Sequence, residues 1–72
     1  MDNDELIRIK AKEARVLSGQ ANEKFRQGQY REGHTLMTLA REAGRTSAAL
    51  INQKLKLDKA LVEFEKIHSF QV

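Results

Sequence analysis

The 72-residue sequence contains no cysteine, no proline and no tryptophan, and only four glycines. The absence of cysteine excludes a disulfide framework and is expected of a protein in a reducing compartment such as the cytoplasm. The absence of proline removes the strongest helix breaker and favours long helices. No apolar run reaches 18 residues, and the stretch Met1-Asp2-Asn3-Asp4-Glu5 is acidic. We therefore expect neither a membrane span nor a secretory signal.

Charge gives little sign of a nucleic-acid partner. Thirteen Lys and Arg residues against ten Asp and Glu give a formal net charge of +3. The densest basic run is Arg8, Lys10, Lys12 and Arg15, with Glu13 inside it. On a helix these side chains spread over more than one face, whereas a nucleic-acid binder gathers them on one stripe. A solvated helix surface is the better interpretation.

Helical periodicity begins directly after the acidic residues and predicts a first helix over residues 4–27. Asp2 with Glu5, or Asn3, supplies an N-cap. One narrow and mostly small-residue stripe runs along this helix: Ile7, Ala11, Ala14, Ser18, Ala21 and Phe25. Ile9 and Val16 lie nearly opposite that stripe. They are either scattered surface residues or a second contact edge, since seven is a seam repeat.

Glycines mark the two expected corners. Gly28 can adopt the left-handed conformation that ends a helix. A second helix is predicted over residues 30–43, with Gly33 on its apolar stripe. Gly44 followed by Thr46 or Ser47 is the usual signal of a helix stop and restart, although a helix running straight through Gly44 is the alternative.

The third predicted helix, residues 47–68, is the most apolar. One stripe holds Leu50, Leu57, Leu61, Phe64 and His68, and a second holds Ile51, Leu55 and Val62. A helix that touches two others needs two such stripes. The sequence therefore predicts an all-α fold, a small three-helix bundle forming a single domain over residues 1–72. Ile51, Leu55 and Val62 are the best candidates for a partner-binding surface, because the thin core cannot cover them completely. Ile9 and Val16 are the next candidates.

Two family resemblances rest on the Gly28 corner and the helix after it. Gly28-Gln29-Tyr30, with small residues at Ala21, Gly33 and Ala40, resembles the corner of one tetratricopeptide repeat. The layout of the whole chain, with Tyr30, Gly33, Met37 and Ala40, is similar to the microtubule-interacting-and-trafficking domain. That resemblance implies a three-helix bundle whose third helix binds short amphipathic segments of partner proteins. Small helical co-chaperones of bacterial secretion systems look similar as well.

Catalytic and metal-binding patterns are absent from the sequence. The two histidines, His34 and His68, fall on different predicted helices, and neither has an acidic residue or another histidine four positions on. We expect no enzyme activity, no cofactor and no metal site. The sequence thus predicts a protein-binding module or adaptor for an amphipathic helix or peptide, with an acidic partner favoured by Lys54 and Lys56. A helical homodimer and a small nucleic-acid-associated regulator are the alternatives.

Overall fold

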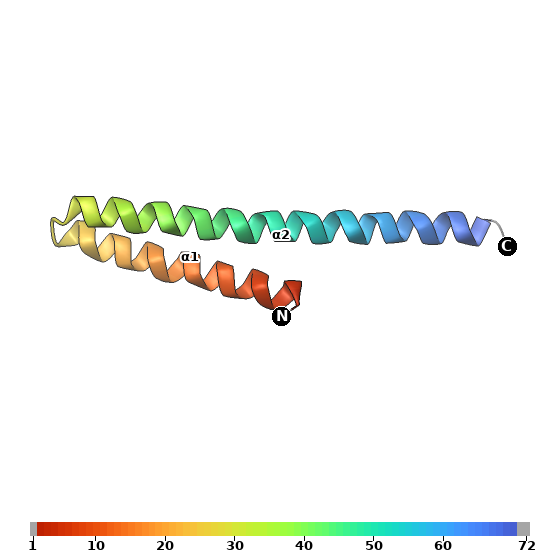
Figure 1. The fold of residues 1–72 in the computed structure, drawn as a ribbon, viewed down its shortest axis with the longest axis horizontal. Coiled ribbons are helices and arrows are strands. Elements are labelled where there is room, and N and C mark those ends of the chain that lie inside the picture. The colour runs from red at the N-terminus through yellow and green to blue at the C-terminus, as the bar shows by residue number, and fades with distance from the viewer. Residues whose placement is uncertain (1, 71–72) are drawn as a thin grey trace.

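The protein is a helical hairpin built from two antiparallel helices, α1 (Asn3–Arg26) and α2 (Tyr30–Phe70) (Figure 1). The computed structural model describes residues 2–70, and side chains as far as Ile67. The all-α prediction is confirmed, but the three-helix bundle is wrong, because the second and third predicted helices are one continuous helix of 41 residues. The hairpin is long and thin, 67 × 18 × 13 Å.

Both ends of α1 are capped as their local sequence predicts. The Asp2 carboxylate accepts a hydrogen bond from the Glu5 backbone N–H at 2.8 Å, so Asp2 is the N-cap. At the other end Gly28 has a φ of 79°. Its N–H bonds the Phe25 carbonyl, and the Gln29 N–H bonds the Lys24 carbonyl. This pair of bonds is a Schellman motif, and it turns the chain directly into α2.

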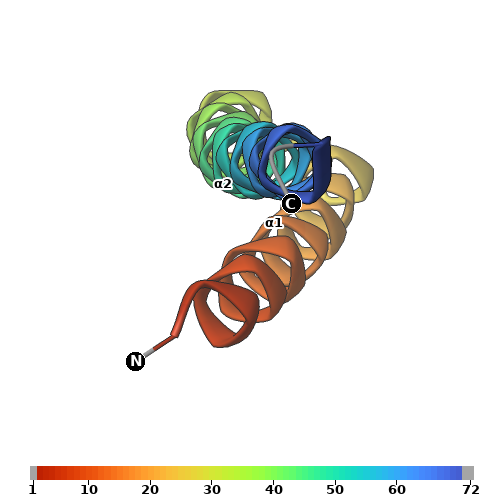
Figure 2. The ribbon, with the colours of Figure 1, turned by 90° about the vertical axis from the view of Figure 1, so that its right-hand side faces the viewer.

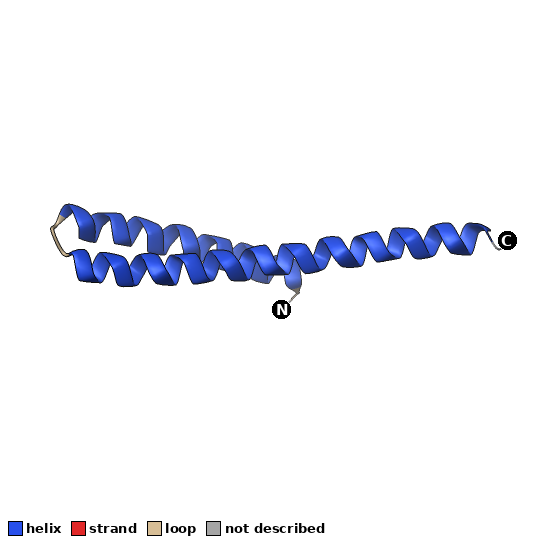
Figure 3. Ribbon diagram, turned by 90° about the horizontal axis from the view of Figure 1, so that it is seen from above, coloured by secondary structure: helices blue, strands red, loops and turns tan. Residues whose placement is uncertain are grey.

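The second corner expected at Gly44 does not exist, and α2 is helical through it (Figure 3). Gly44 does not have the positive φ that a left-handed helix end needs. Neither hydroxyl expected to cap a new helix does so. Thr46 bonds the Glu42 carbonyl one turn back in the same helix, and Ser47 bonds the Ile7 carbonyl of α1. The features that would end a helix are therefore absent at Gly44.

Small residues form the seam between the two helices. The buried residues are Ala21 on α1 and Gly33, Ala40, Ala43 and Ser47 on α2. The Phe25 ring covers Gly33 so closely that a Cβ on that glycine would lie 2.6 Å from the ring. Small side chains let two helices approach closely, but they bury little apolar area. The seam is narrow, as the sequence predicts.

The helices differ in length, and this difference leaves part of α2 without a neighbour. α1 has 24 residues and α2 has 41. The Asp4 carboxylate lies 2.7 Å from the Lys54 ammonium group, so α1 begins beside residue 54 of α2. Residues 55–70 extend past that point, about 24 Å at 1.5 Å per residue, and we call this segment the overhang. Figures 1 and 3 show α2 continuing alone beyond α1, and Figure 2 views the hairpin from that end.

Candidate protein-docking surface

The overhang carries most of the large apolar side chains that the hairpin leaves in solvent. Between 49% and 63% of each residue is exposed for Leu55, Leu57, Leu61, Val62, Phe64 and Ile67. A surface helix of a globular protein normally turns such a face toward a core. α1 borders the overhang where it begins, at Leu55 and Asp58, and the large apolar side chains beyond remain about half exposed. The overhang is therefore the main candidate for a docking surface.

These side chains divide into two edges of the helix. By helical-wheel arithmetic Leu57, Leu61, Phe64 and Ile67 share an arc of about 120°, which we call the broad edge. Leu55 and Val62 lie about 100–120° from Leu61 on the other side, with Ile51 near them. Asp58 and Glu65 separate the two edges. The sequence singled out the second edge, and the structure leaves its three residues exposed as well.

The broad edge was missed as a site because its residues were assigned to the bundle. Leu57, Leu61 and Phe64 fall on the more apolar stripe of the predicted third helix. Had the chain turned at Gly44, the hairpin could have covered that stripe. Because α2 runs straight on, the stripe leaves the hairpin and remains exposed. Only the continuity of the helix through Gly44 could have revealed it. His68, the last residue of the stripe, lies outside the residues with described side chains.

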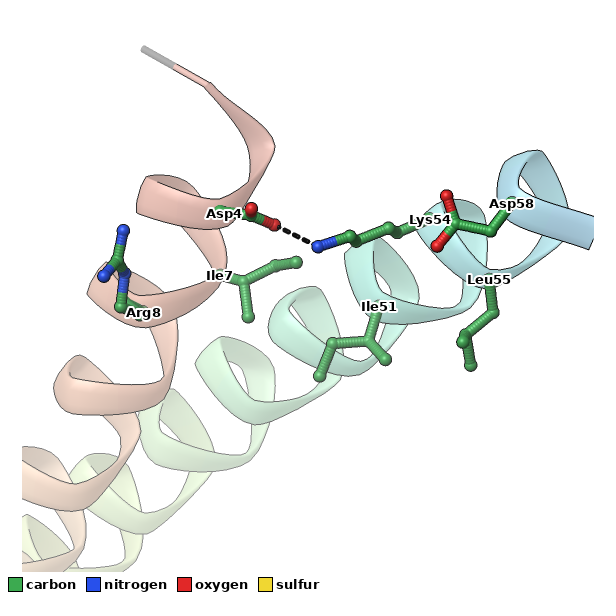
Figure 4. A pocket seen from close by; sticks show the side chains of 7 residues that line it. All are labelled: Asp4, Ile7, Arg8, Ile51, Lys54, Leu55 and Asp58. Carbon is green, nitrogen blue, oxygen red and sulfur yellow. Dashed lines mark hydrogen bonds and ion pairs between the residues drawn. The ribbon is translucent and has the colours of Figure 1, made fainter. Parts of the chain in front are cut away.

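Where the overhang begins, α1 and α2 enclose an open groove of about 500 Å³. Its apolar lining is Ile7 of α1 with Ile51 and Leu55 of α2. Figure 4 shows Asp4 and Lys54 reaching toward each other across this groove. Arg8 and Asp58 complete the lining. Two of the predicted binding residues, Ile51 and Leu55, therefore meet α1 here, whereas Val62 lies one to two turns further along the overhang.

The Asp4–Lys54 pair sets the electrostatics of the groove. The hydrogen bond from Lys54 lowers the pKa of Asp4, and the same bond raises the pKa of Lys54. Both groups thus remain charged over a wide pH range. Because the Lys54 charge is already paired within the chain, the predicted preference for an acidic partner would depend on Lys56.

Ile9 and Val16 lie together, but away from the other predicted binding residues. They line a groove formed by residues of α1 alone. Leu17 and several polar side chains complete its lining. About half of Ile9 and of Val16 is exposed. The structure therefore supports a second apolar edge on α1 and does not join it to Ile51, Leu55 or Val62.

A third groove follows the seam itself and was not foreseen. Leu17 of α1 faces Leu39 and Ala43 of α2 across it, and Leu39 is 44% exposed. The polar residues of this groove are Lys10, Glu13, Glu42 and Thr46. A groove between two helices, apolar along its floor and charged at its rims, is the place where a third helix packs in a bundle. We call it the seam groove.

The described residues contain no group of three or more His, Cys, Asp or Glu side chains able to hold a metal ion. The His34 ring packs edge-on against Phe25 at 5.2 Å, on the surface near the corner. No helix among the described residues is long and apolar enough to cross a membrane.

The fold and its surfaces define a helical hairpin with an extended, apolar second helix. Comparison with protein families, with curated proteins and with solved structures found no match for this chain. The resemblance to tetratricopeptide and microtubule-interacting-and-trafficking domains stays a prediction.

Proposed function

We propose that this protein is a non-enzymatic binding module whose overhang docks an amphipathic helix. The carrying observation is the exposure of the four large side chains of the broad edge, each about 60% exposed: Leu57, Leu61, Phe64 and Ile67. Recognition of a helix in an apolar groove uses anchors spaced i, i+3, i+4 and i+7. The broad edge presents Leu57, Leu61 and Phe64 at the same spacing.

Energetics favour the broad edge over the narrower one. Burying one large apolar side chain completely contributes roughly 1.5–3 kcal/mol. Association must first offset several kcal/mol of lost translational and rotational freedom. The four large side chains of the broad edge can offset this cost more easily than the three of the second edge, which Asp58 interrupts. Leu61 lies at the centre of the overhang and is the best position for a probe.

Photo-crosslinking tests the proposal inside the cells that make the protein. A photoreactive amino acid replaces Leu61 in one variant and Lys59 in a matched control. Lys59 lies about 160° away around the same helix. We expect crosslinked protein adducts from position 61 and none above background from position 59. Equal labelling from both positions, or none from position 61, would contradict a docking role for the broad edge.

A further inference from the structure

One stripe of α2 joins the seam groove to the overhang. From Leu39 onward, positions at alternating spacings of four and three carry mostly small or apolar residues: Leu39, Ala43, Thr46, Leu50, Gln53, Leu57, Ala60, Phe64 and Ile67. Such a repeat stays on one side of a helix over several turns, with a drift of about 20° per heptad. Its first three members line the seam groove, and its last four lie on the overhang. The exposed part of the stripe on the overhang is thus continuous with the seam groove, which α1 borders on one side.

The two halves of this stripe meet when the stripe is reversed about its centre. The half beside α1 has Leu39, which is 44% exposed, followed by Ala43 and Thr46 in an open groove. The half on the overhang has Leu57, Phe64 and Ile67, each about 60% exposed, with Ala60 among them. Gln53 stands at the middle, fourteen positions from Leu39 and fourteen from Ile67. A reversed copy therefore places Ile67 opposite Leu39 and Ala60 opposite Thr46, so that large side chains meet large ones and small side chains meet small ones.

We infer that the occupant of the broad edge is a second copy of this chain, with the two α2 helices antiparallel and their two-fold axis near Gln53. The inference rests on the proposed docking role of the overhang and names its partner. Each overhang lies in the seam groove of the other copy, parallel to its α1. The contact is isologous, so each chain contributes its seam groove and its overhang to the interface.

This arrangement places three helices side by side. At each end of the dimer a cross-section contains α1 and α2 of one copy and the overhang of the other. Leu61 lies next to the stripe on the side of Ala40 and Ser47, the residues that face α1. In the dimer Leu61 therefore faces α1 of the other copy.

A dimer interface of standard size would cover a small part of the hairpin surface. A standard interface buries about 800 Å² on each partner. This is less than one seventh of the 5999 Å² of accessible surface on the hairpin. The polar Gln53 at the axis also has a known use, because a single polar residue in an apolar seam specifies register and orientation at some loss of stability.

Single-cysteine crosslinking tests the orientation, and the chain has no cysteine of its own. In the antiparallel dimer Gln53→Cys meets its counterpart near the axis, whereas Ala60→Cys, on the same stripe, lies some 15–25 Å from its own at 1.5 Å per residue. Lys59→Cys controls for random collision. We expect rapid disulfide formation at 53 and only background at 60 and 59. Equal crosslinking at 53 and 60 would indicate parallel helices, and background at 53 would overturn the axis position.

Sedimentation of two matched leucine variants tests the stripe. Leu57→Asp and Leu55→Asp both place a charge on an overhang residue that is about 60% exposed, but only Leu57 belongs to the stripe. We expect dimers for wild type and Leu55→Asp, and at least a tenfold weaker dimer for Leu57→Asp. Circular dichroism checks that each variant retains its hairpin. The inference is wrong if the wild type is monomeric at its highest soluble concentration, or if Leu55→Asp is the disruptive change.

The crosslinking from Leu61 separates the failure of this inference from that of the proposed function. If the wild type is monomeric and position 61 captures only other proteins, the docking surface stands and the self-association falls. If the wild type is monomeric and position 61 captures nothing, both fall.

Discussion

The Ser47 hydroxyl donates a hydrogen bond of 3.3 Å to the backbone carbonyl of Ile7, forty positions away in the chain. Ser47 is 6% exposed and lies in the seam. A serine at this position has two local uses, as a helix cap or as a small residue at a close helix contact. The structure uses the second. α2 is continuous through Ser47, and its last sixteen residues extend beyond α1.

The two helical glycines of α2 should respond oppositely to substitution. A Cβ at Gly33 would lie 2.6 Å from the Phe25 ring, whereas a Cβ at Gly44 would meet nothing within 4 Å. We expect Gly33→Leu to lower the free energy of unfolding by about 1–3 kcal/mol through overpacking. We expect Gly44→Ala to raise it by up to about 1 kcal/mol, because alanine is the better helix former.

Thermal and urea denaturation measure both effects. Gly19→Ala is the control for helix propensity on α1, because Gly19 is helical and also open. A stabilising Gly33→Leu would mean that the seam is looser than the Phe25 contact indicates. A destabilising Gly44→Ala would mean that α2 bends or breaks at Gly44 in solution.

Local signals predicted much of this fold correctly. The Asp2 cap, the Gly28 corner and the small-residue stripe through Ala21 all appear as expected. Each depends on a few neighbouring residues that favour one local structure. The exposure of Ile9 and Val16 also follows from helical phase, which is insensitive to small errors in helix ends.

The predicted topology was wrong because of one residue, Gly44. The sequence Gly44-Arg45-Thr46-Ser47 satisfies a stop and restart as well as a continuous helix. The decision depends on whether Ser47 is better placed at a cap or against Ile7, and that is a tertiary question. The broad edge was not predicted as a site because of the same error, since Leu57 and Phe64 look like core residues only if the chain turns back.

The Asp4–Lys54 pair should give a small pH-dependent contribution to stability. The pKa of Asp4 is lowered on folding, so its contribution is complete above about pH 4 and is lost as the pH falls through the folded pKa. The pKa of Lys54 is raised, so its contribution is complete below about pH 10 and is lost as the pH rises through the folded value. The pair therefore stabilises the groove across the neutral range.

Asp4→Asn tests this contribution. At pH 7 we expect a slightly lower melting temperature than wild type, and at pH 2 we expect the two melting curves to coincide. The effect is small because both side chains are about half exposed. High salt should shrink the difference at pH 7, since it screens exposed charges. A difference that persists at pH 2 would show that Asp4 acts through helix capping or packing instead.

The helicity of the overhang should depend on protein concentration. An isolated helix of about 12–15 residues is marginal in water, because most helical stability in proteins comes from packing an apolar face. Residues 57–67 leave their large apolar side chains about half or more exposed, whereas residues 36–47 pack against α1. In a dilute monomer we therefore expect amides of residues 57–67 to exchange with deuterium far faster than those of the seam.

Raising the concentration should slow exchange in the overhang if a second copy covers it. Hydrogen exchange followed by mass spectrometry measures this segment by segment, and Leu57→Asp is the matched control that should remain unprotected at every concentration. Residues 36–47 serve as the internal reference, since α1 covers them in monomer and dimer alike. Strong protection of the overhang in dilute wild type would mean that this helix is stable alone, and concentration would then have no effect on its exchange.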